Sequence, residues 1–327
     1  MAQELEGGAA YGHCEEIDGN RRMTGGMNPE DSTRSQTRPA VETVAEVMAA
    51  AARLGPDGRG RFFAPSSLQS WPGIVHGGGL VALLDGAARS LGGDARPRRL
   101  EGRLTSSVPL ETALDLEAHA DGGAVTVSIV ERGQPITSAA ITAGAIEPAP
   151  ADPGGRLDAR EGWPLPFSDQ CLACGARNPL GLQLGLRFDH DGVWARFVPR
   201  APWRGPGGRL DPALPAVLLD EMAWWLGALV TKEGGLTNRI DLTLIRPDAV
   251  VSGPLVAVGR FEAVTPVDRR RTFWRTHSAL VAADGAVLAT AAIVFRAGAD
   301  YSTRQMAFFR SRTAPEIFAR MFPNHAG

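Results

Sequence analysis

Hydrophobic residues follow one pattern twice along this chain of 327 residues: a long apolar segment, then four segments in which apolar and polar residues alternate. The apolar segments cover about residues 78–92 and 212–232, and their length predicts helices. Alternation such as Ala124-Val125-Thr126-Val127-Ser128-Ile129 predicts strands, whose side chains point to the two faces of a sheet in turn. The predicted strands cover 98–108, 112–120, 124–132, 135–146, 236–246, 254–265, 270–283 and 286–297.

The two halves also match residue by residue, which indicates an internal duplication. Leu83-Leu84-Asp85 aligns with Leu218-Leu219-Asp220. The aligned segments are Gly73–Ala88 with Gly208–Ala223, Leu104–Pro109 with Leu242–Pro247, and Gly133–Ile141 with Gly285–Ile293. Three matches in the same order are hard to explain by chance. Together with the repeated order of segments, they predict two copies of one helix on an antiparallel sheet.

Flanking segments complete the predicted organisation. Alternation at 182–188 and 193–197, around the turn Asp189-His190-Asp191-Gly192, predicts a hairpin before the second helix. Short helices are expected at 39–54 and 314–321. The expected divisions are a disordered segment 1–36, a first domain 37–147, a linker 148–166, a second domain 167–298 and a C-terminal extension 299–327.

Charge and composition exclude some classes of function. The formal net charge is −2 and the pI is about 6.3, which argues against a nucleic-acid partner. No apolar run reaches the roughly 18 residues of a membrane span, and the polar, acidic first residues lack the apolar stretch of a secretory signal. Three cysteines, an odd and low number, suit a reducing cytoplasm. We therefore expect a cytoplasmic protein with no membrane partner.

The loop before the first predicted helix carries candidate chemistry. His76-Gly77-Gly78 begins the helix, and Asp85 follows on an otherwise apolar stripe. Glycines let a ligand approach the backbone, and the first N–H groups of a helix lack partners inside it. Such a helix end stabilises an anion, including one formed during a reaction. Two donors and a carboxylate suffice for attack on an acyl carbonyl, although His76 is alternatively no more than a polar N-cap.

This arrangement, His-Gly-Gly with an Asp nine residues after the His and then four strands, resembles the hotdog-fold acyl-CoA thioesterases of the phenylacetyl-CoA and 4-hydroxybenzoyl-CoA type. The segment Cys171–Leu182 resembles the opening segment of many such proteins. The resemblance covers about 60–147 and 167–297, and it implies an α+β chain with two hotdog domains, each a long helix wrapped by an antiparallel sheet. In the family, glycine N–H groups polarise the thioester carbonyl, and a carboxylate acts as nucleophile or general base.

Helix geometry indicates which carboxylate works with which loop. Eight residues of a helix span roughly 12 Å, so a carbonyl at the Gly77 amide is too far from Asp85 on the same helix. The family's sites lie between two units, and we therefore expect Asp220 of the second copy to face His76, Gly77 and Gly78. Asp220 and Glu221 point about 100° apart on a helix, and the alignment with Asp85 favours Asp220.

The second loop departs from the family pattern, with Asp211, Pro212 and Ala213 at the positions of His76, Gly77 and Gly78. Pro212 has no N–H to donate, and Asp211 places a negative charge where an oxyanion would form. Asp followed by Pro suits a helix start as N-cap and first residue. We expect one competent site for each chain, with Asp85 facing the second, degenerate loop.

Other residues are candidates for substrate binding. Met222 and Trp224 on the second helix line an acyl pocket or pack in the core. Asn178 orients a carbonyl or water, or caps a turn. Arg270, within a run of three arginines, meets the phosphates of coenzyme A or is a solvated surface residue.

No metal is expected, because Cys171 and Cys174 have ligand spacing but the sequence lacks the second pair that a four-ligand zinc site needs. No cofactor is expected besides coenzyme A as part of the substrate. The resemblance implies hydrolysis of an acyl-CoA or acyl-carrier thioester, in a chain that could pair further as a homodimer through exposed strand edges. Two alternatives remain open: a non-catalytic acyl-CoA or small-molecule binding protein, and a hotdog hydratase or dehydratase of enoyl thioesters, less favoured because no Asp and His have that branch's spacing.

Overall fold

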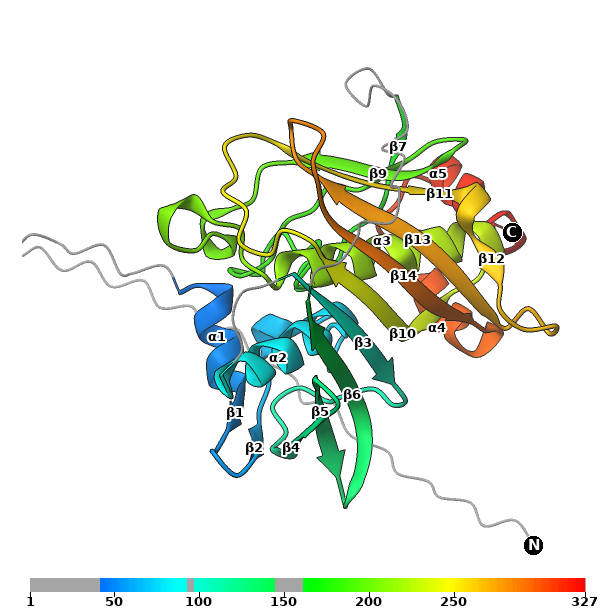
Figure 1. Cartoon of the computed structure of the whole chain (residues 1–327). Helices are drawn as coiled ribbons and strands as arrows, with labels where there is room; N and C mark the ends of the chain where they lie inside the picture. Colours follow the sequence, from blue (N-terminus) through cyan, green and yellow to red (C-terminus); the bar gives the residue numbers. More distant parts are fainter. Residues whose placement is uncertain (1–41, 93–96, 145–160, 327) are drawn as a thin grey trace, which may run out of the picture. The chain divides into compact units, whose positions relative to one another are not determined.

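One antiparallel sheet runs through both halves of the chain (Figure 1). The computed structural model describes residues 42–92, 97–144 and 161–326, and the expected disordered segment 1–36 and most of the expected linker 148–166 lie outside them. Val41–Gly327 forms one compact unit. Within the described residues the sheet has fourteen strands in the order β1-β2-β4-β5-β6-β3-β10-β14-β13-β11-β9-β8-β7, with β12 paired to β13.

The structure confirms the predicted helix and four strands in each half, with ends shifted by a few residues. The first half contains α2 (Gly77–Ser90), β3 (Arg98–Leu104), β4 (Leu114–Asp121), β5 (Ala124–Glu131) and β6 (Gln134–Ala143). The second half contains α3 (Leu214–Thr231), β10 (Gly235–Leu244), β11 (Leu255–Arg260), β13 (Phe273–Val281) and β14 (Val287–Ala297). A fifth strand of two residues, β12 (Thr265–Pro266), was not predicted as a separate element.

The two halves also share one strand order, as an internal duplication would produce. In each half the first strand pairs with the fourth, the fourth with the third, and the third with the second, giving β3-β6-β5-β4 and β10-β14-β13-β11. The two first strands, β3 and β10, pair with each other from Arg98 opposite Leu244 to Arg103 opposite Arg239. This pairing joins the halves into a single sheet.

Both halves begin with a hairpin that extends the sheet beyond the second strand. In the second half, β8 (Arg187–Phe188) and β9 (Gly192–Phe197) pair on either side of the predicted turn, which confirms this hairpin. The strand β9 also pairs with β11. The predicted strand at 182–186 is wrong, because Leu182 and Leu184 donate backbone hydrogen bonds to the loop around Cys171 instead. The short strand β7 (Trp163–Pro164) pairs with β8 and ends the sheet.

The first-half hairpin was not predicted. The helix expected at 39–54 is shorter: α1 (Val44–Ala51) starts at a capping box formed by Thr43 and Glu46, and the chain then turns into β1 (Ala52–Leu54). A turn leads to β2 (Arg59–Phe62), which pairs with β4. The turn sequence Gly55-Pro56-Asp57-Gly58 is a hairpin signal that could have revealed this pair.

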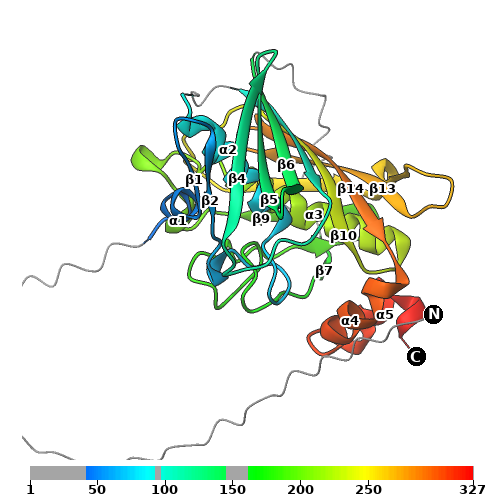
Figure 2. The same cartoon turned by 90° about the horizontal axis from the view of Figure 1, so that it is seen from below.

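Two differences in the second half have local causes. The strand expected at 254–265 stops at Arg260, where a 3₁₀ turn, Phe261–Ala263, interrupts it. The helix expected at 314–321 is confirmed as α5 (Pro315–Met321), but the preceding α4 (Ala299–Arg310) was not predicted. Figure 2 shows both helices beyond the end of β14, away from the strands of the first half.

The central helices α2 and α3 pack on the strands of their own half and touch each other (Figure 1). By length and composition α3 would also pass as a membrane span, but 83% of it is buried, as in the core helix of a globular fold. The contact between the helices depends on Gly78. A Cβ at this position would lie 2.1 Å from the Ala216 carbonyl oxygen and 2.8 Å from Asp220 Cβ. Only glycine permits the observed approach without a shift of α3.

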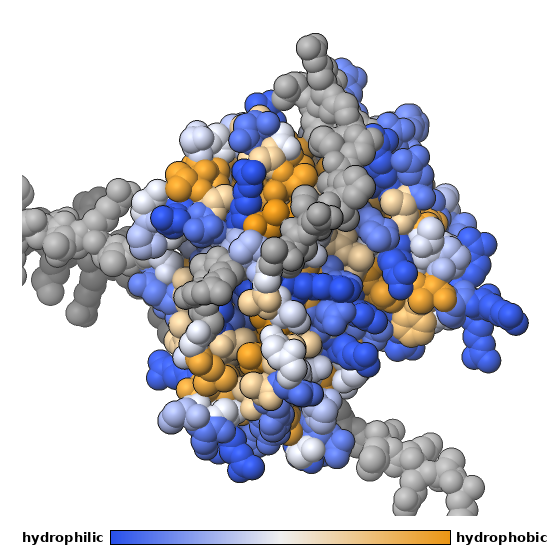
Figure 3. All heavy atoms as spheres, in the orientation of Figure 1, coloured by the Kyte–Doolittle hydropathy of each residue, from blue (hydrophilic) through white to orange (hydrophobic). Residues whose placement is uncertain are grey.

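The edges of the sheet are short. Its end strands in the described residues, β1 and β7, have three and two residues, and such short edges offer little for another chain to pair with. On the face drawn in Figure 3, hydrophobic residues lie in small groups separated by hydrophilic ones. The expected homodimer therefore stays a prediction.

We predict opposite effects of alanine at two glycines of α2. Gly78→Ala forces α2 away from α3 and lowers the free energy of unfolding by about 1–3 kcal/mol, the usual range for overpacking. Gly86→Ala, where the nearest atom to a new Cβ is Arg89 Nη2 at 3.9 Å, raises it by about 0.5–1 kcal/mol through helix propensity. Urea unfolding measures both values, and equal stability of the two variants would contradict the packing argument.

Candidate active site

The N-terminus of α2 has four backbone N–H groups without partners inside the helix. Three of these groups donate hydrogen bonds to other protein atoms. The His76 N–H donates to the Leu68 carbonyl at 3.0 Å, the Gly78 N–H to Asp220 Oδ2 at 2.6 Å, and the Gly79 N–H to His76 Nδ1 at 3.4 Å. Among the described residues, no group accepts the Gly77 N–H. This remaining donor belongs to a residue that lines a cavity.

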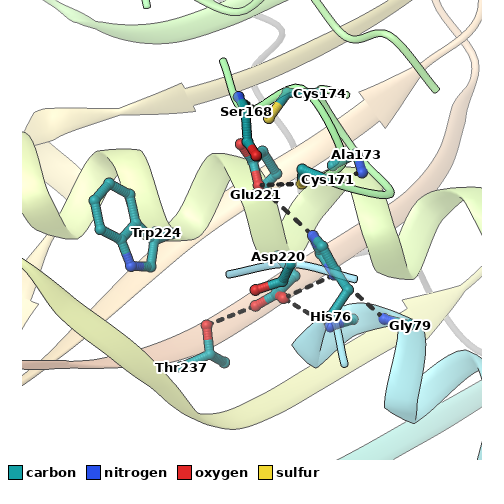
Figure 4. A network of polar contacts seen from close by, with 12 residues as sticks. His76, Gly79, Ser168, Cys171, Ala173, Cys174, Asp220, Glu221, Trp224 and Thr237 are labelled. Carbon is teal, nitrogen blue, oxygen red and sulfur yellow. Dashed lines mark hydrogen bonds and ion pairs between the residues drawn. The ribbon is translucent and has the colours of Figure 1, made fainter. Parts of the chain in front are cut away.

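Asp220 comes from α3 of the other half, and its carboxylate accepts from both halves. Gly78 donates to Oδ2, and the Thr237 hydroxyl of β10 donates to Oδ1 at 2.6 Å (Figure 4). The β10–β14 pairing shifts register between Thr237 and Arg239, a bulge of the kind that redirects side chains next to sites. Burial raises the pKa of Asp220, opposed by the charge on His76 and by the hydrogen bonds from Thr237 and Gly78.

His76 lies between two carboxylates of α3 (Figure 4). Its Nδ1 is 3.4 Å from Asp220 Oδ2, and its Nε2 is 3.6 Å from Glu221 Oε2. Burial disfavours the charged ring, but hydrogen bonds with Cys171 and Glu221 and the nearby negative groups together raise the pKa of His76 well above its usual value. In the charged ring Nδ1–H points at Asp220, and the long contact from Gly79 is then lost. His76 is the N-cap of α2, one of the two roles considered from the sequence, and it also lines the cavity.

Glu221 faces the same site as Asp220, although the two neighbours point in different directions around α3. Cys171 Sγ lies 3.9 Å from Glu221 Oε2. The hydrogen bond from Cys174 lowers the pKa of the Cys171 thiol to about 7, whereas the same bond and burial raise the pKa of Cys174. Sequence reasoning set Glu221 aside and missed its contacts with His76 and Cys171.

A cavity of about 220 Å³ opens beside these groups. Aromatic rings form part of its lining, with ring centroids 5.9 Å apart for Trp71 and Trp224 and 5.3 Å apart for Trp71 and Phe308. Arg296 is the one cationic side chain, histidine aside, among the described residues that line the cavity. Sequence reasoning missed Trp71 and Arg296, and it missed Phe308 because α4 was not predicted.

Of the four residues expected to bind substrate, one lines the cavity and three lie outside its lining. Trp224 lines the cavity, whereas Met222 is fully buried outside the lining. The Asn178 amide donates to the Ser67 and Gln170 carbonyls at 2.8 and 2.9 Å and accepts from Leu180 at 3.0 Å. Asn178 therefore holds its loop, as the turn interpretation held, and does not reach the cavity. Arg270 is exposed on the turn between β12 and β13, outside the lining.

Asp85, the carboxylate expected to face the degenerate loop, is engaged in a buried ion pair. Arg98 of β3 reaches it in two places, with Nε–Oδ1 and Nη2–Oδ2 distances of 2.6 Å, and Arg89 Nε lies 3.3 Å from Oδ2. Two guanidinium groups neutralise the carboxylate, so Asp85 ties α2 to β3 and does not line the cavity.

The loop before α3 has Asp211, Pro212 and Ala213 where the loop before α2 has His76, Gly77 and Gly78. The helix α3 begins two residues later than the sequence predicted. Asp211 Oδ1 accepts from the Ala213 N–H at 2.9 Å, and Ala213, not Asp211, is the N-cap of α3. Burial raises the pKa of Asp211, opposed by the Ala213 hydrogen bond and by the charge on Arg89. Because Arg89 also pairs with Asp85, this loop is linked to the neutralised carboxylate.

Comparisons with known proteins support the fold. No protein-family model and no curated protein matches the sequence. Among solved structures, a conserved protein with hot dog fold from Alicyclobacillus acidocaldarius matches with a TM-score of 0.55 at 17% identity, over 77% of this chain and 98% of that chain. A candidate thioesterase from Novosphingobium aromaticivorans matches with a TM-score of 0.53 at 21% identity, over 76% and 98% of the chains.

An acyl-CoA thioesterase II from Mycobacterium marinum matches with a TM-score of 0.52 at 13% identity, over 78% of this chain and 97% of that chain. At this level of identity the matches show the architecture alone. Each of these solved chains is covered almost completely by the same helix-and-sheet arrangement, and the protein therefore has the hotdog fold.

Proposed function

We propose that the chain is a tandem hotdog thioesterase that hydrolyses an acyl-CoA or acyl-carrier thioester to the free acid and a thiol. The observation that carries this proposal is the open Gly77 N–H at the cavity, one residue from the N–H that binds Asp220. A donor at the positive end of α2 and a buried carboxylate are the two groups that acyl transfer to water requires.

In the proposed reaction, the thioester carbonyl oxygen accepts the Gly77 N–H, and a water molecule lies at Asp220. The water oxygen attacks the carbonyl carbon while Asp220 takes its proton. The oxyanion that forms is stabilised by Gly77 and the dipole of α2. Collapse of this intermediate breaks the carbon–sulfur bond, and the thiolate leaves and takes up a proton. In the alternative route, Asp220 attacks the carbonyl itself and water hydrolyses the resulting anhydride.

The roles of Gly77 and Gly78 in this proposal differ from those expected from the sequence. The Gly78 N–H serves the carboxylate, so Gly77 alone is the oxyanion donor in this proposal. Trp71 and Trp224 suit an aromatic or compact apolar acyl group, because flat rings bury such groups with little entropy cost. Arg296 at the cavity is better placed than Arg270 for a phosphate of the carrier.

We predict that Asp220→Asn lowers thiol release by about 10²- to 10⁴-fold, the usual contribution of a general base. The assay uses a panel of short, branched, medium-chain and aromatic acyl-CoAs. Asp115→Asn, which alters an exposed carboxylate paired with Arg61, is the matched control and keeps the rate. Melting temperatures check that both variants are folded. Full thiol release by Asp220→Asn would exclude its role in the reaction.

A second prediction isolates the Gly77 N–H. Gly77→Ala and Gly77→Pro both add a Cβ that meets Asp220 Oδ2 at 2.8 Å, but only proline removes the donor. Proline suits the first helical position, and the extended backbone of His76, with ψ at 131°, suits the residue before it.

We expect thiol release by Gly77→Pro to be about 10²- to 10³-fold slower than by Gly77→Ala, the cost of one oxyanion donor. The alanine variant accounts for any effect of the added carbon. Equal rates for the two folded variants would show that the carbonyl does not bind at this N–H.

One observation favours a second candidate, a hydratase or dehydratase of enoyl thioesters. The sequence offers no Asp and His in that branch's spacing, but folding brings His76 Nδ1 to 3.4 Å from Asp220 Oδ2 beside the cavity, as an acid–base pair would need. Product mass distinguishes the reactions, since hydration adds water to an enoyl chain and hydrolysis frees the acid. Acyl-CoAs that raise the melting temperature without any reaction would instead identify a binding protein.

A further inference from the structure

Three side chains from distant parts of the chain meet at one point beside the cavity. They are His76 at the start of α2, Cys171 in the loop before β8, and Glu221 on α3, and one ligand atom of each lies within 4.8 Å of the others. His76 Nε2 is 3.6 Å and Cys171 Sγ is 3.9 Å from the same oxygen, Glu221 Oε2. Imidazole, thiolate and carboxylate together form a donor set typical of zinc.

The loop that carries Cys171 is built around its sulfur atoms. The Ala173 N–H donates to Cys171 Sγ at 3.3 Å, and the Ser168 N–H lies 3.5 Å from Cys174 Sγ. Both cysteines are buried and form no disulfide. Backbone N–H groups aimed at sulfur stabilise negative charge there. The loop therefore suits a thiolate at Cys171, whereas Cys174 lies in the same loop outside the three groups that meet within 4.8 Å (Figure 4).

The second nitrogen of His76 has the partner that a metal-bound histidine usually has. Such a ring binds the ion through one nitrogen and donates the N–H of the other to a carboxylate. Here Nε2 faces Glu221, and Nδ1 lies 3.4 Å from Asp220 Oδ2. Thr237 and Gly78 in turn hold Asp220 in place.

We propose that this chain binds one divalent transition-metal ion, zinc above all, through His76 Nε2, Cys171 Sγ and Glu221 Oε2, which leaves the fourth tetrahedral position for a non-protein ligand. Bonds of about 2.0–2.3 Å place tetrahedral ligands roughly 3.3–3.8 Å apart, close to the 3.6 and 3.9 Å separations. The expectation of no metal rested on the absence of a second ligand pair near Cys171 and Cys174. In the fold, α2 and α3 bring two further ligands to Cys171.

This proposal does not depend on the thioesterase. A bound ion leaves the proton of His76 on Nδ1, directed at Asp220, and is therefore compatible with Asp220 as a base. It occupies Nε2 and prevents His76 from exchanging protons through that nitrogen. Metal binding is measured without any acyl substrate, so its outcome is distinguishable from that of either proposed reaction.

The experiment uses the full chain, reduced and freed of metal by a chelator, and titrated with Co²⁺ and then Zn²⁺ alone. We expect one ion for each chain, an absorption band from cobalt–thiolate charge transfer, and its loss when Zn²⁺ displaces Co²⁺. Cys171→Ser abolishes the band, whereas Cys14→Ser, which removes the third cysteine, leaves it unchanged. Cys174→Ser also leaves the band, because Cys174 lies outside the three-residue ligand set.

Two further variants test the geometry in case Cys171→Ser fails to fold. Glu221→Gln keeps the Cys171 thiolate and retains the band but binds Zn²⁺ more weakly. Asp220→Asn, a change outside the ligand set, lowers the affinity by about 10- to 100-fold, the usual effect of a partner of a ligating histidine. A reduced protein without the charge-transfer band, or a band that survives Cys171→Ser, would overturn the proposal.

Discussion

The arrangement of the candidate site depends on the close approach of two helix backbones at Gly78. Because this residue has no side chain, the first turn of α2 lies against Ala216 and Asp220 of α3. The Gly78 N–H then reaches the Asp220 carboxylate at 2.6 Å, and His76 comes between Asp220 and Glu221. One missing Cβ thus brings groups from both halves of the chain to one point, beside a cavity that Gly77 also lines.

The two halves share a topology but use their equivalent aspartates in opposite ways. Asp85 is neutralised by Arg98 and Arg89 and holds α2 to β3, whereas Asp220 accepts hydrogen bonds from Gly78 and Thr237 and faces the cavity. The reason lies in the partners that the sheet supplies: β3 presents a guanidinium to one helix, and β10 presents a hydroxyl to the other. A duplicated fold therefore carries a structural ion pair on one side and a candidate reactive carboxylate on the other.

Local patterns predicted much of this architecture. The apolar segments and the alternating segments correspond to α2, α3 and the strands that follow them, because helix and strand periodicities are properties of neighbouring residues. The elements that were missed depend on pairings that periodicity along the chain does not show. The strand β2 is four residues long and exists by pairing with β4, and 182–186 bonds to the Cys171 loop instead of forming a strand.

The candidate site divides in the same way. The sequence by itself determined that a glycine loop precedes one helix, that the second loop carries Asp211 and Pro212 in its place, and that a carboxylate stands at equivalent positions of both helices. Tertiary structure alone decided that Gly78 binds Asp220, that Asn178 serves its loop, and that Cys171 meets His76 and Glu221. These contacts join residues far apart in the sequence, where no periodicity relates one side chain to another, and only the packing of α2 against α3 sets their distances.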